Sequence, residues 1–307
     1  MNSEVKNIEI SVIIVNYNTR ELLINCLDSL HFNVTGVTYE IIVVDNASAD
    51  ESVESVNKKY PFVKTIASPV NLGFGRANNL GAKEAVGKYL LLLNSDTILI
   101  EDSISKMCNF FTENEEKLKI GSLGCTLIDE NNNIMNSGGG FPRIKYDYKE
   151  YFFQILSRVF KMKFEGSDEY DFTLPYFDIN YVIGADIMMK RDVFNALGGF
   201  DDKFFMYYEE ADLQYRLRKK LKLNCYIYTQ TKIIHLEGGS DSSVQKVSNR
   251  KRIMIQESRN YYYKKNDTLY YPIYLITDMI FNVKTIFKRG YTYKENLEYV
   301  SKNIKSY

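Results

Sequence analysis

Acidic and polar side chains follow three apolar segments of the sequence. Asn16 comes after IEISVIIV, Asp45 and Asn46 follow EIIVV, and Asp96 closes LLLLNSD. Such groups can bind a nucleotide, and a carboxylate such as Asp96 is an oxygen ligand for a hard divalent cation. Each residue also has a structural alternative. Asp45 could form an Asx turn or a helix N-cap, and Asp96 could cap a helix at 98–111, so these alternatives to ligand binding stay open.

A second set of carboxylates lies behind the aromatic run FFMYY. Glu209, Glu210 and Asp212 fall within four residues of one another. Apolar surroundings raise the pKa of a carboxyl group, which suits a general base that works near neutral pH. The alternative is an acidic first turn of a helix at 209–221, favoured by the helix dipole, in which Asp212 pairs with Arg216.

His235 is one of only two histidines, and it ends the strand-like segment TKIIH. The Gly-rich turn LEGGS follows, where the backbone can approach a phosphate closely. No GxGxxG follows the first strand and GxxxxGK[ST] is absent, so a Rossmann dinucleotide site is not indicated and a P-loop is excluded. A divalent metal ion is the physical alternative for holding a diphosphate.

The elements that must position these residues alternate between strands and helices. The order predicts an α/β fold with a mostly parallel, doubly wound sheet flanked by helices. Ligands of such sheets bind beyond the carboxyl ends of the strands, where the polar residues fall. Strands are expected at 8–17, 40–44, 63–67 and 89–93, and helices at 19–30, 50–60 and 77–85.

The alternation weakens in the second part of the chain. The aromatic and charged stretch 146–178 predicts a loop or short helices near the acceptor. Further strands are expected at 123–128, 180–190 and 224–230, and further helices at 191–197 and 209–221.

Composition limits the class of protein. A chain of 307 residues, 45% of them hydrophobic, suits one large α/β domain with a small appendage. Four cysteines without a CxxC pair indicate reduced thiols, and residues 1–9 lack the apolar region of a signal peptide. The apolar stretch 270–287 contains Asp278 and Lys284, which argues against a spanning helix and leaves an interfacial helix open. We therefore expect a cytoplasmic protein.

The C-terminal part of the chain is basic and rich in tyrosine. Residues 244–307 carry 13 Lys/Arg, 5 Asp/Glu and 10 of the 25 tyrosines, although the whole chain has zero net charge. This predicts a catalytic domain at 1–243 and a basic helical extension at 244–307. A basic extension can bind an anionic surface, and both nucleic acid and a phospholipid headgroup layer are candidates. Of the two, we expect a peripheral contact with the inner face of the plasma membrane and no binding of nucleic acid. A helical lid or a homodimer contact is the alternative.

Taken together, the motifs resemble the family 2 glycosyltransferases of the GT-A fold, most closely their bacterial rhamnosyltransferase-like branch. The joint match is far more specific than any one motif. The matching segments lie in the family's order between about residues 10 and 243: SVIIVNYN, IIVVDNASAD, NLGFGRANN, YLLLLNSD, VIGADIMMKRDVFNALGGFDDKFFMYYEEADLQYRL and HLEGGS.

The resemblance implies roles at matching positions. Asp45 would contact the nucleotide base or ribose, and Arg76 and Asn78 would lie near the nucleotide or its phosphates. Asn94-Ser95-Asp96 matches the DxD motif, in which Asp96 would bind the metal, with His235 as a further ligand. The expected donor-binding residues are Asn16, Asp45, Asn46, Arg76, Asn78, Asn94, Ser95 and Asp96.

The Glu209-Glu210 pair matches a Glu-Asp pair whose second member is usually the catalytic base, which favours Glu210 over Glu209. Two positions depart from the family pattern. Asn94 replaces the first DxD aspartate and leaves one carboxylate for the metal, and Glu210 is one methylene longer than the usual aspartate. The residues assigned to the acceptor side are Gly184, Asp201 and Asp212.

The resemblance implies an inverting, metal-dependent transfer of a sugar, with rhamnose the first candidate, from a nucleotide diphosphate to an acceptor hydroxyl. The expected cofactor is Mn²⁺ or Mg²⁺, and the expected donors are dTDP- or UDP-linked sugars. The acceptor is expected to be a glycan or a lipid-linked oligosaccharide of cell-surface polysaccharide or glycolipid assembly.

Two rival interpretations are a sugar-nucleotide nucleotidyltransferase and a non-catalytic, sugar-binding relic of the fold. A nucleotidyltransferase usually has a Gly-rich, basic loop after the first strand. NYNTRELL stands there instead and argues against it.

Overall fold

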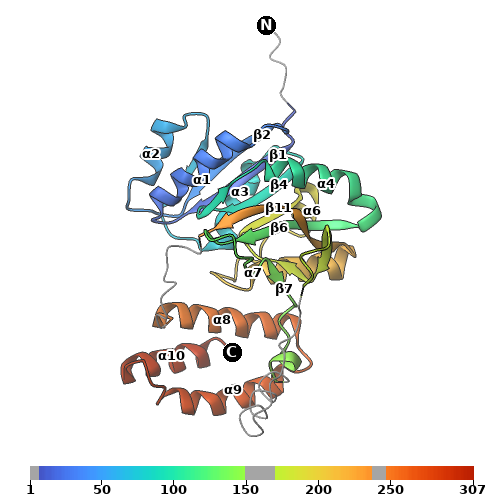
Figure 1. The fold of residues 1–307 in the computed structure, drawn as a ribbon. Helices are drawn as coiled ribbons and strands as arrows, with labels where there is room; N and C mark the ends of the chain where they lie inside the picture. The colour runs from blue at the N-terminus through green and yellow to red at the C-terminus, as the bar shows by residue number, and fades with distance from the viewer. Residues whose placement is uncertain (1–6, 149–169, 237–246) are drawn as a thin grey trace.

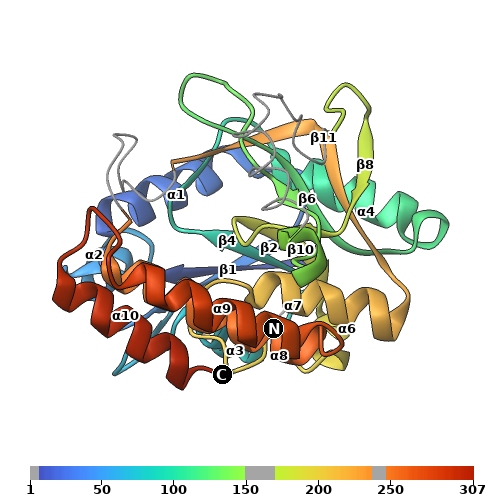
Figure 2. The ribbon, with the colours of Figure 1, turned by 90° about the horizontal axis from the view of Figure 1, so that it is seen from below.

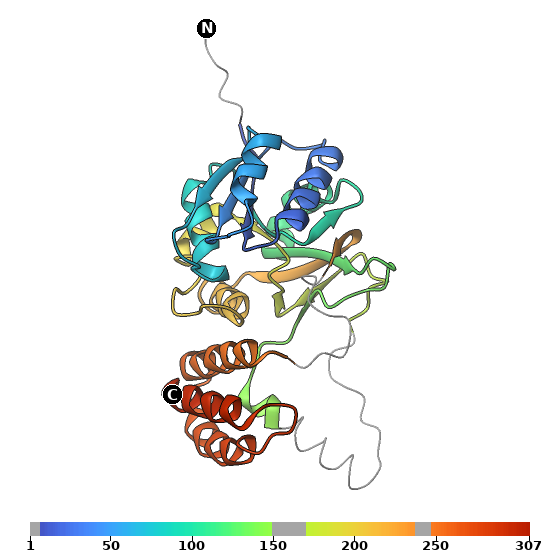
Figure 3. The same ribbon diagram turned by 90° about the vertical axis from the view of Figure 1, so that its left-hand side faces the viewer.

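The computed structural model describes residues 7–148, 170–236 and 247–307. A sheet with helices on both faces forms the larger part, and three C-terminal helices lie beneath it (Figure 1). The first of them, α8 (Asn249–Asn266), lies against the larger part. Helices α9 (Tyr271–Thr285) and α10 (Tyr293–Lys305) lie on the far side of α8 (Figure 3).

The main sheet contains nine strands within the described ranges, in the order β3-β2-β1-β4-β10-β6-β11-β5, with β8 paired to β11. A separate pair joins β7 (Gly138–Gly139) to β9 (Tyr181–Val182). The nine strands are β1 (Ile10–Asn16), β2 (Tyr39–Asp45), β3 (Lys64–Ala67), β4 (Tyr89–Asn94), β5 (Thr97–Leu99), β6 (Ile120–Ile128), β8 (Tyr176–Ile179), β10 (Asp186–Lys190) and β11 (Asn224–His235).

Strand direction places the carboxyl ends of β1, β2 and β4 at one edge. These strands and β3 are parallel neighbours, and β10 runs antiparallel between β4 and β6. In this register Asn16 lies opposite Asp45, and Asn94 lies opposite Val15. The polar residues that end three separate strands therefore form one row, as the predicted α/β sheet requires.

Helices cover both faces of the sheet because its strands are apolar on both sides. In β1, Val12 and Ile14 join the core that includes α1 and α4, whereas Ile13 joins the core that includes α3, α6 and α7. These helices are α1 (Arg20–Asn33), α2 (Ser52–Lys59), α3 (Phe74–Glu84), α4 (Ser103–Leu118), α6 (Arg191–Ala196) and α7 (Glu209–Arg216).

The predicted fold class is confirmed, and all seven elements expected before residue 94 are present. A helix at 98–111 is wrong, because the chain enters β5 directly after Asp96 and α4 begins only at Ser103, capped by Asp102. The predicted strand 180–190 is interrupted between β9 and β10, and the helix that begins at Glu209 ends in a π-helical turn at Leu217–Leu221.

The C-terminal extension is helical, as predicted. The proposed boundary between residues 243 and 244 lies outside the described residues, as do 149–169 of the aromatic stretch. None of the helices in the described ranges combines the length and apolar composition needed to cross a membrane. All four cysteines are buried and free.

Ion pairs and packed tyrosines join α8 to the larger part. The ammonium of Lys265 lies 2.7 Å from a carboxylate oxygen of Asp201 and 2.7 Å from one of Asp212. Tyr262 and Tyr263 pack in one buried cluster with Phe204 and Ala211. Figure 2, seen from below, shows the three helices lying across the underside of the sheet and α7.

A close backbone contact joins the Gly-rich loop before α3 to the segment before α7. Gly73 has φ +80°, and a Cβ atom there would lie 1.9 Å from the carbonyl oxygen of Phe205. The neighbouring Phe74 amide donates a hydrogen bond of 3.1 Å to that same oxygen. Only glycine provides both the positive φ and the space for this contact.

We expect Gly73→Ala to lower the free energy of unfolding by about 3 kcal/mol or more, because backbone strain and a backbone clash add together. The matched control is Gly198→Ala, where φ is +76° but nothing lies within 4 Å of the added Cβ. That variant should lose only about 1 kcal/mol from strain. Urea unfolding measures both, and equal losses would refute the contact.

Candidate active site

The first part of the site is the pair Asn16 and Asp45 at the edge of the sheet. The Asn16 amide donates to Asp45 Oδ1 at 2.9 Å, and the Ser48 backbone N–H donates to Asp45 Oδ2 at 2.9 Å. The Ser48 bond spans three residues, one more than the bond of an Asx turn, and α2 begins only at Ser52, so Asp45 is not its N-cap. Asp45 is 4% exposed, so its carboxylate is held rigidly before any ligand arrives.

Asn46 supports the Gly-rich loop from the adjacent position. Its side-chain oxygen accepts the Leu72 N–H at 2.7 Å, and its amide donates to Asn71 Oδ1 at 3.0 Å and to the Gly73 carbonyl at 3.1 Å. Asn46 is itself buried. These contacts fix the loop beside Asp45 and indicate a positioning role for Asn46.

A chain of side-chain hydrogen bonds connects the Asp45 end of the edge to the Asn94-Ser95-Asp96 turn. The Thr19 hydroxyl donates to Asn16 Oδ1 at 2.7 Å and shares a 3.1 Å hydrogen bond with the Ser95 hydroxyl. The strand ends from Asp45 to Ser95 are therefore joined in one hydrogen-bonded network. Thr19 was not singled out from the sequence.

The second part of the site is the pair Asp96 and His235. Antiparallel pairing of β5 with β11 sets His235 opposite Thr97, and His235 Nε2 lies 3.4 Å from Asp96 Oδ1. The Asn94 amide nitrogen lies 3.4 Å from the same Nε2. Both side chains remain partly accessible, at 11% for His235 and 13% for Asp96.

This donor set fits a divalent cation that also binds a diphosphate. The carboxylate of Asp96 and the imidazole of His235 supply two adjacent ligands, and phosphate oxygens can complete the coordination. Among the described residues, no group of three or more His, Cys, Asp or Glu side chains is arranged to hold a metal by itself. The part of the HLEGGS motif after Leu236 lies outside those residues.

The third part of the site is the start of α7. Tyr207 and Tyr208 have φ values of 72° and 69°, a left-handed conformation that is rare for bulky side chains and concentrates at functional sites. They turn the chain so that Glu209 and Glu210 open the helix. Gln214 fastens α7 to β9 through two hydrogen bonds with the Val182 backbone, at 2.9 and 2.7 Å.

The two glutamates differ in exposure. Glu209 is 3% exposed, whereas Glu210 is partly exposed. Burial raises the pKa of Glu209 well above its usual range, and repulsion from Glu210 raises it further. Burial also raises the pKa of Glu210. Glu210 therefore combines accessibility with increased basicity, the two properties a general base needs.

Arg76 and Asn78 lie in the first turns of α3, directly after the Gly-rich loop, and have different surroundings. Arg76 Nε donates to the Leu72 carbonyl at 2.7 Å, and its guanidinium carbon lies 6.0 Å from the centre of the Phe205 ring. Asn78 is 1% exposed and donates to the Phe74 carbonyl within its own helix. Arg76 thus lies beside the segment that leads to Glu209, whereas Asn78 is an interior residue of α3.

The three residues assigned to the acceptor side are not brought together as one group. Asp212 is fully buried and bonded to Arg216, Lys265 and Asn266. Asp201 also pairs with Lys265, so both carboxylates join α7 and its preceding loop to α8. Gly184 lies against the Phe74 ring. Their assignment to the acceptor side stays a prediction.

Sequence reasoning missed Asp186, a fully buried carboxylate on β10. Its Oδ2 accepts the Cys125 N–H at 2.6 Å, while its Oδ1 has no hydrogen-bond partner. Burial raises the pKa of Asp186 to about 7, and the Cys125 hydrogen bond opposes this rise. The sequence feature that could have identified this buried carboxylate is a single acidic residue within the apolar run IGADIMM.

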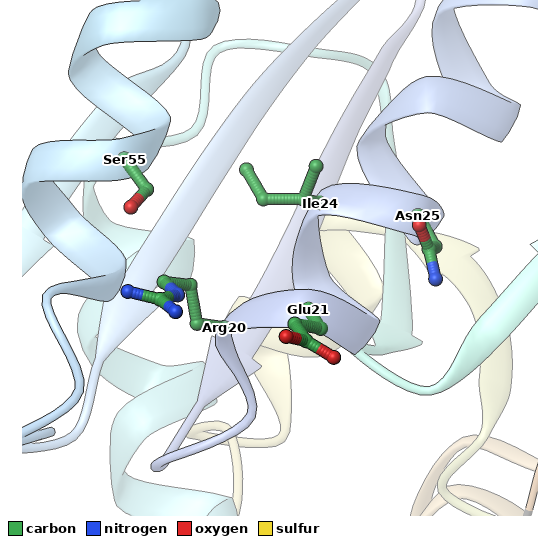
Figure 4. Close-up of a pocket in the computed structure, with 5 residues that line it drawn as sticks. All are labelled: Arg20, Glu21, Ile24, Asn25 and Ser55. Carbon is green, nitrogen blue, oxygen red and sulfur yellow. The ribbon is translucent and has the colours of Figure 1, made fainter.

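A shallow hollow lies apart from these residues, on the outside of α1 and α2 (Figure 4). No predicted site residue lines it, and we assign it no function. Its lining residues are Arg20, Glu21, Ile24, Asn25 and Ser55.

Comparison with solved structures identifies the fold of this chain as the GT-A fold. The mannosyltransferase PcManGT from Pyrobaculum calidifontis, in complex with GDP-Man and Mn²⁺, superposes with a TM-score of 0.55 at 13% identity, covering 98% of this chain and 74% of that chain. GalNAc-T7 with UDP, GalNAc and Mn²⁺ gives a TM-score of 0.54 at 16% identity, covering 83% and 50%. At these identities the likeness concerns the fold alone.

The family follows from the sequence. The model of glycosyl transferase family 2 matches residues 11–198, more than half of the chain, so the chain belongs to that family. A poly(ribitol-phosphate) beta-glucosyltransferase of Bacillus spizizenii is 37% identical over 120 residues, 38% of this chain and 19% of the relative.

An N-acetylglucosaminyl-diphospho-decaprenol L-rhamnosyltransferase of Mycobacterium tuberculosis is 24% identical over 237 residues, 70% of this chain and 72% of the relative. Other relatives are longer than the match. The chain spans 43% of an uncharacterized glycosyltransferase of Haemophilus influenzae and 18% of the O-antigen biosynthesis protein RfbC of Myxococcus xanthus.

Asp186 gives the pH dependence of stability a definite sign. Its pKa is raised from 3.8 to about 7 in the folded chain, so the unfolded chain ionises first as pH rises. Between pH 4 and pH 7 this group therefore removes stability, and the loss is complete above about pH 7. We expect Asp186→Asn to be more stable than wild type at pH 8 by about 4 kcal/mol, with no gain near pH 4.

Urea unfolding across this pH range measures the effect. Exposed Asp192 provides the matched control, and Asp192→Asn should leave the pH dependence unchanged. A constant difference between Asp186→Asn and wild type at every pH would contradict the assignment.

Proposed function

We propose that this chain transfers a sugar from a nucleotide diphosphate to an acceptor hydroxyl, with inversion at the anomeric carbon. The observation that carries the proposal is the adjacency of Asp96 and His235 at the sheet edge, 3.4 Å apart although they come from distant parts of the sequence. The edge also carries Asp45, and the start of α7 supplies a carboxylate of raised pKa.

The donor-binding roles follow from chemistry and position. Asp45, held by Asn16, accepts hydrogen bonds from the base or ribose, and Arg76 neutralises charge near the diphosphate. Asp96 and His235 are the residues that would hold Mn²⁺ or Mg²⁺. When bound, such a cation stabilises the negative charge of the leaving nucleoside diphosphate. Asn94 contributes an amide beside His235 in place of a second carboxylate.

The carboxylate of Glu210 acts as the general base. It takes the proton of the acceptor hydroxyl while that oxygen forms a bond to the anomeric carbon. The bond from the anomeric carbon to the diphosphate oxygen breaks in the same displacement, and its electrons leave with the nucleoside diphosphate. Glu209 is less accessible than Glu210, and burial together with repulsion from Glu210 raises the pKa of Glu209 well above its usual range, which favours Glu210 as the base.

The relatives support a donor and an acceptor class. One relative is an L-rhamnosyltransferase that acts on a diphospho-decaprenol, and another is a beta-glucosyltransferase of poly(ribitol-phosphate). We therefore propose rhamnose on dTDP as the first donor to test and UDP-linked hexoses as the second. The proposed acceptor is a cell-surface glycan or a lipid-linked precursor of one.

Substituting the proposed base tests this function directly. We expect Glu210→Gln to fold normally and to lose about 10²–10⁴-fold in the rate of transfer, because the amide cannot accept the hydroxyl proton. The measurement is release of nucleoside diphosphate from a panel of dTDP- and UDP-sugars with acceptor present, after circular dichroism has confirmed the fold.

Glu209→Gln is the matched control, since it removes a neighbouring carboxylate of the same size. We expect it to retain most of the transfer rate. Near-normal turnover in Glu210→Gln together with a large loss in Glu209→Gln would reassign the base. Absence of turnover in wild type with every donor of the panel would contradict the proposed function.

A further inference from the structure

Helix α9 places its polar side chains inside the C-terminal bundle and its apolar side chains outside. Its buried residues are Tyr274, Asp278 and Asn282. A set of large apolar residues on and beside the helix is exposed in the described structure. We refer to these as the α9 stripe: Leu269, Ile273, Ile276, Ile280, Val283 and Phe287.

A network of side-chain hydrogen bonds holds the polar side of α9 inside the bundle. Asp278 Oδ2 accepts hydrogen bonds from Asn303 Nδ2 at 2.6 Å and from the Tyr307 hydroxyl at 2.5 Å. Asn303 Nδ2 also donates to Asn282 Oδ1 at 2.9 Å, and Asn303 Oδ1 accepts from Asn260 of α8 at 2.5 Å. Rotating α9 to bury the stripe would break these contacts.

The α9 stripe is continuous along the helix. Its residues alternate in steps of four and three, which keeps them on one side of an α-helix. Phe287 is 77% exposed and Ile276 is 63% exposed. A helix of a water-soluble bundle has the opposite arrangement, with its apolar side inward. Exposed apolar patches of this kind mark contact surfaces.

The surroundings of the stripe favour a lipid surface as the occupant. Lys284, Lys288 and Arg289 are exposed at the C-terminal end of α9, and the one acid within the helix, Asp278, is buried inside the bundle. A second copy of this chain would bring the same positive charges, which repel one another. Anionic headgroups complement them, and acyl chains accommodate the apolar side chains.

The dimensions set the orientation. At 1.5 Å per residue, the 15 residues of α9 extend about 22 Å, shorter than a hydrocarbon layer of roughly 30 Å. The helix also lies on the side of the bundle away from the sheet (Figure 3). We propose that α9 lies along the surface of an anionic membrane, with its stripe in the acyl boundary and its basic end at the headgroups.

The inference rests on α9 alone, and its test measures binding without sugar transfer. A failure to bind vesicles would therefore leave the proposed sugar transfer intact. A failure to transfer sugar would likewise leave the proposed membrane contact intact. If both hold, the membrane contact brings the catalytic domain close to a lipid-linked acceptor.

Vesicle flotation of the full chain tests the contact. We expect wild type to float with equimolar phosphatidylcholine and phosphatidylglycerol and to bind phosphatidylcholine alone more weakly. Ile276→Glu/Ile280→Glu should lower the partition coefficient by about 100-fold, since each buried isoleucine contributes about tenfold. Lys288→Gln/Arg289→Gln should reduce binding several-fold on the anionic vesicles only.

Phe62→Glu/Val86→Glu is the matched control, because both residues are exposed and apolar but lie on the catalytic domain before β3 and β4. It should float like wild type, and circular dichroism should be unchanged in every variant. Wild type remaining with the unbound protein on anionic vesicles would overturn the proposal. So would a lipid-independent dimer, seen by analytical ultracentrifugation, that the Ile276→Glu/Ile280→Glu variant converts to monomer.

Discussion

The antiparallel pairing of β5 with the end of β11 determines where the candidate metal ligands lie. β5 is only three residues long, yet its register sets His235 opposite Thr97, one residue beyond Asp96. The parallel registers of β1, β2 and β4 bring Asn16, Asp45 and Asn94 to the same edge. Because every one of these positions is fixed by backbone hydrogen bonds, the side chains meet without long flexible loops.

A second set of constraints holds the start of α7 against that edge. Gly73 allows the Gly-rich loop to contact the Phe205 carbonyl. Tyr207 and Tyr208, both with positive φ, then turn the chain into α7. Asp212 and Asp201 continue the connection through Lys265 into α8. The start of α7, which carries Glu210, is therefore held by contacts with both the sheet-containing part of the chain and helix α8.

The sequence alone was sufficient to predict the strands that are apolar on both faces and end in polar residues. It predicted β1, β2 and β4 because burial on both sides leaves a continuous apolar run. It failed at β5, where the short TIL segment is a strand only because β11 pairs with it, a tertiary contact with no local signal.

The sequence also did not predict which side of α9 faces the interior of the bundle. The apolar run containing Asp278 is visible in the sequence, but only the partners Asn303 and Tyr307 determine that its polar side faces inward. Among the site residues, Asp45, Asp96 and His235 were predictable from their places at strand ends. Asp186 was not singled out, because its burial depends on neighbouring strands that are distant in sequence.

The central claim is that Asp96 and His235 bind one divalent cation together with the donor diphosphate. Pulsed electron paramagnetic resonance of Mn²⁺ bound to the full chain with UDP detects imidazole nitrogen coordinated to the metal. The chain has only two histidines, so the assignment is direct. We expect a nitrogen coupling that persists in His31→Ala and disappears in His235→Ala. No imidazole coupling in wild type, or one that survives in His235→Ala, would contradict the account.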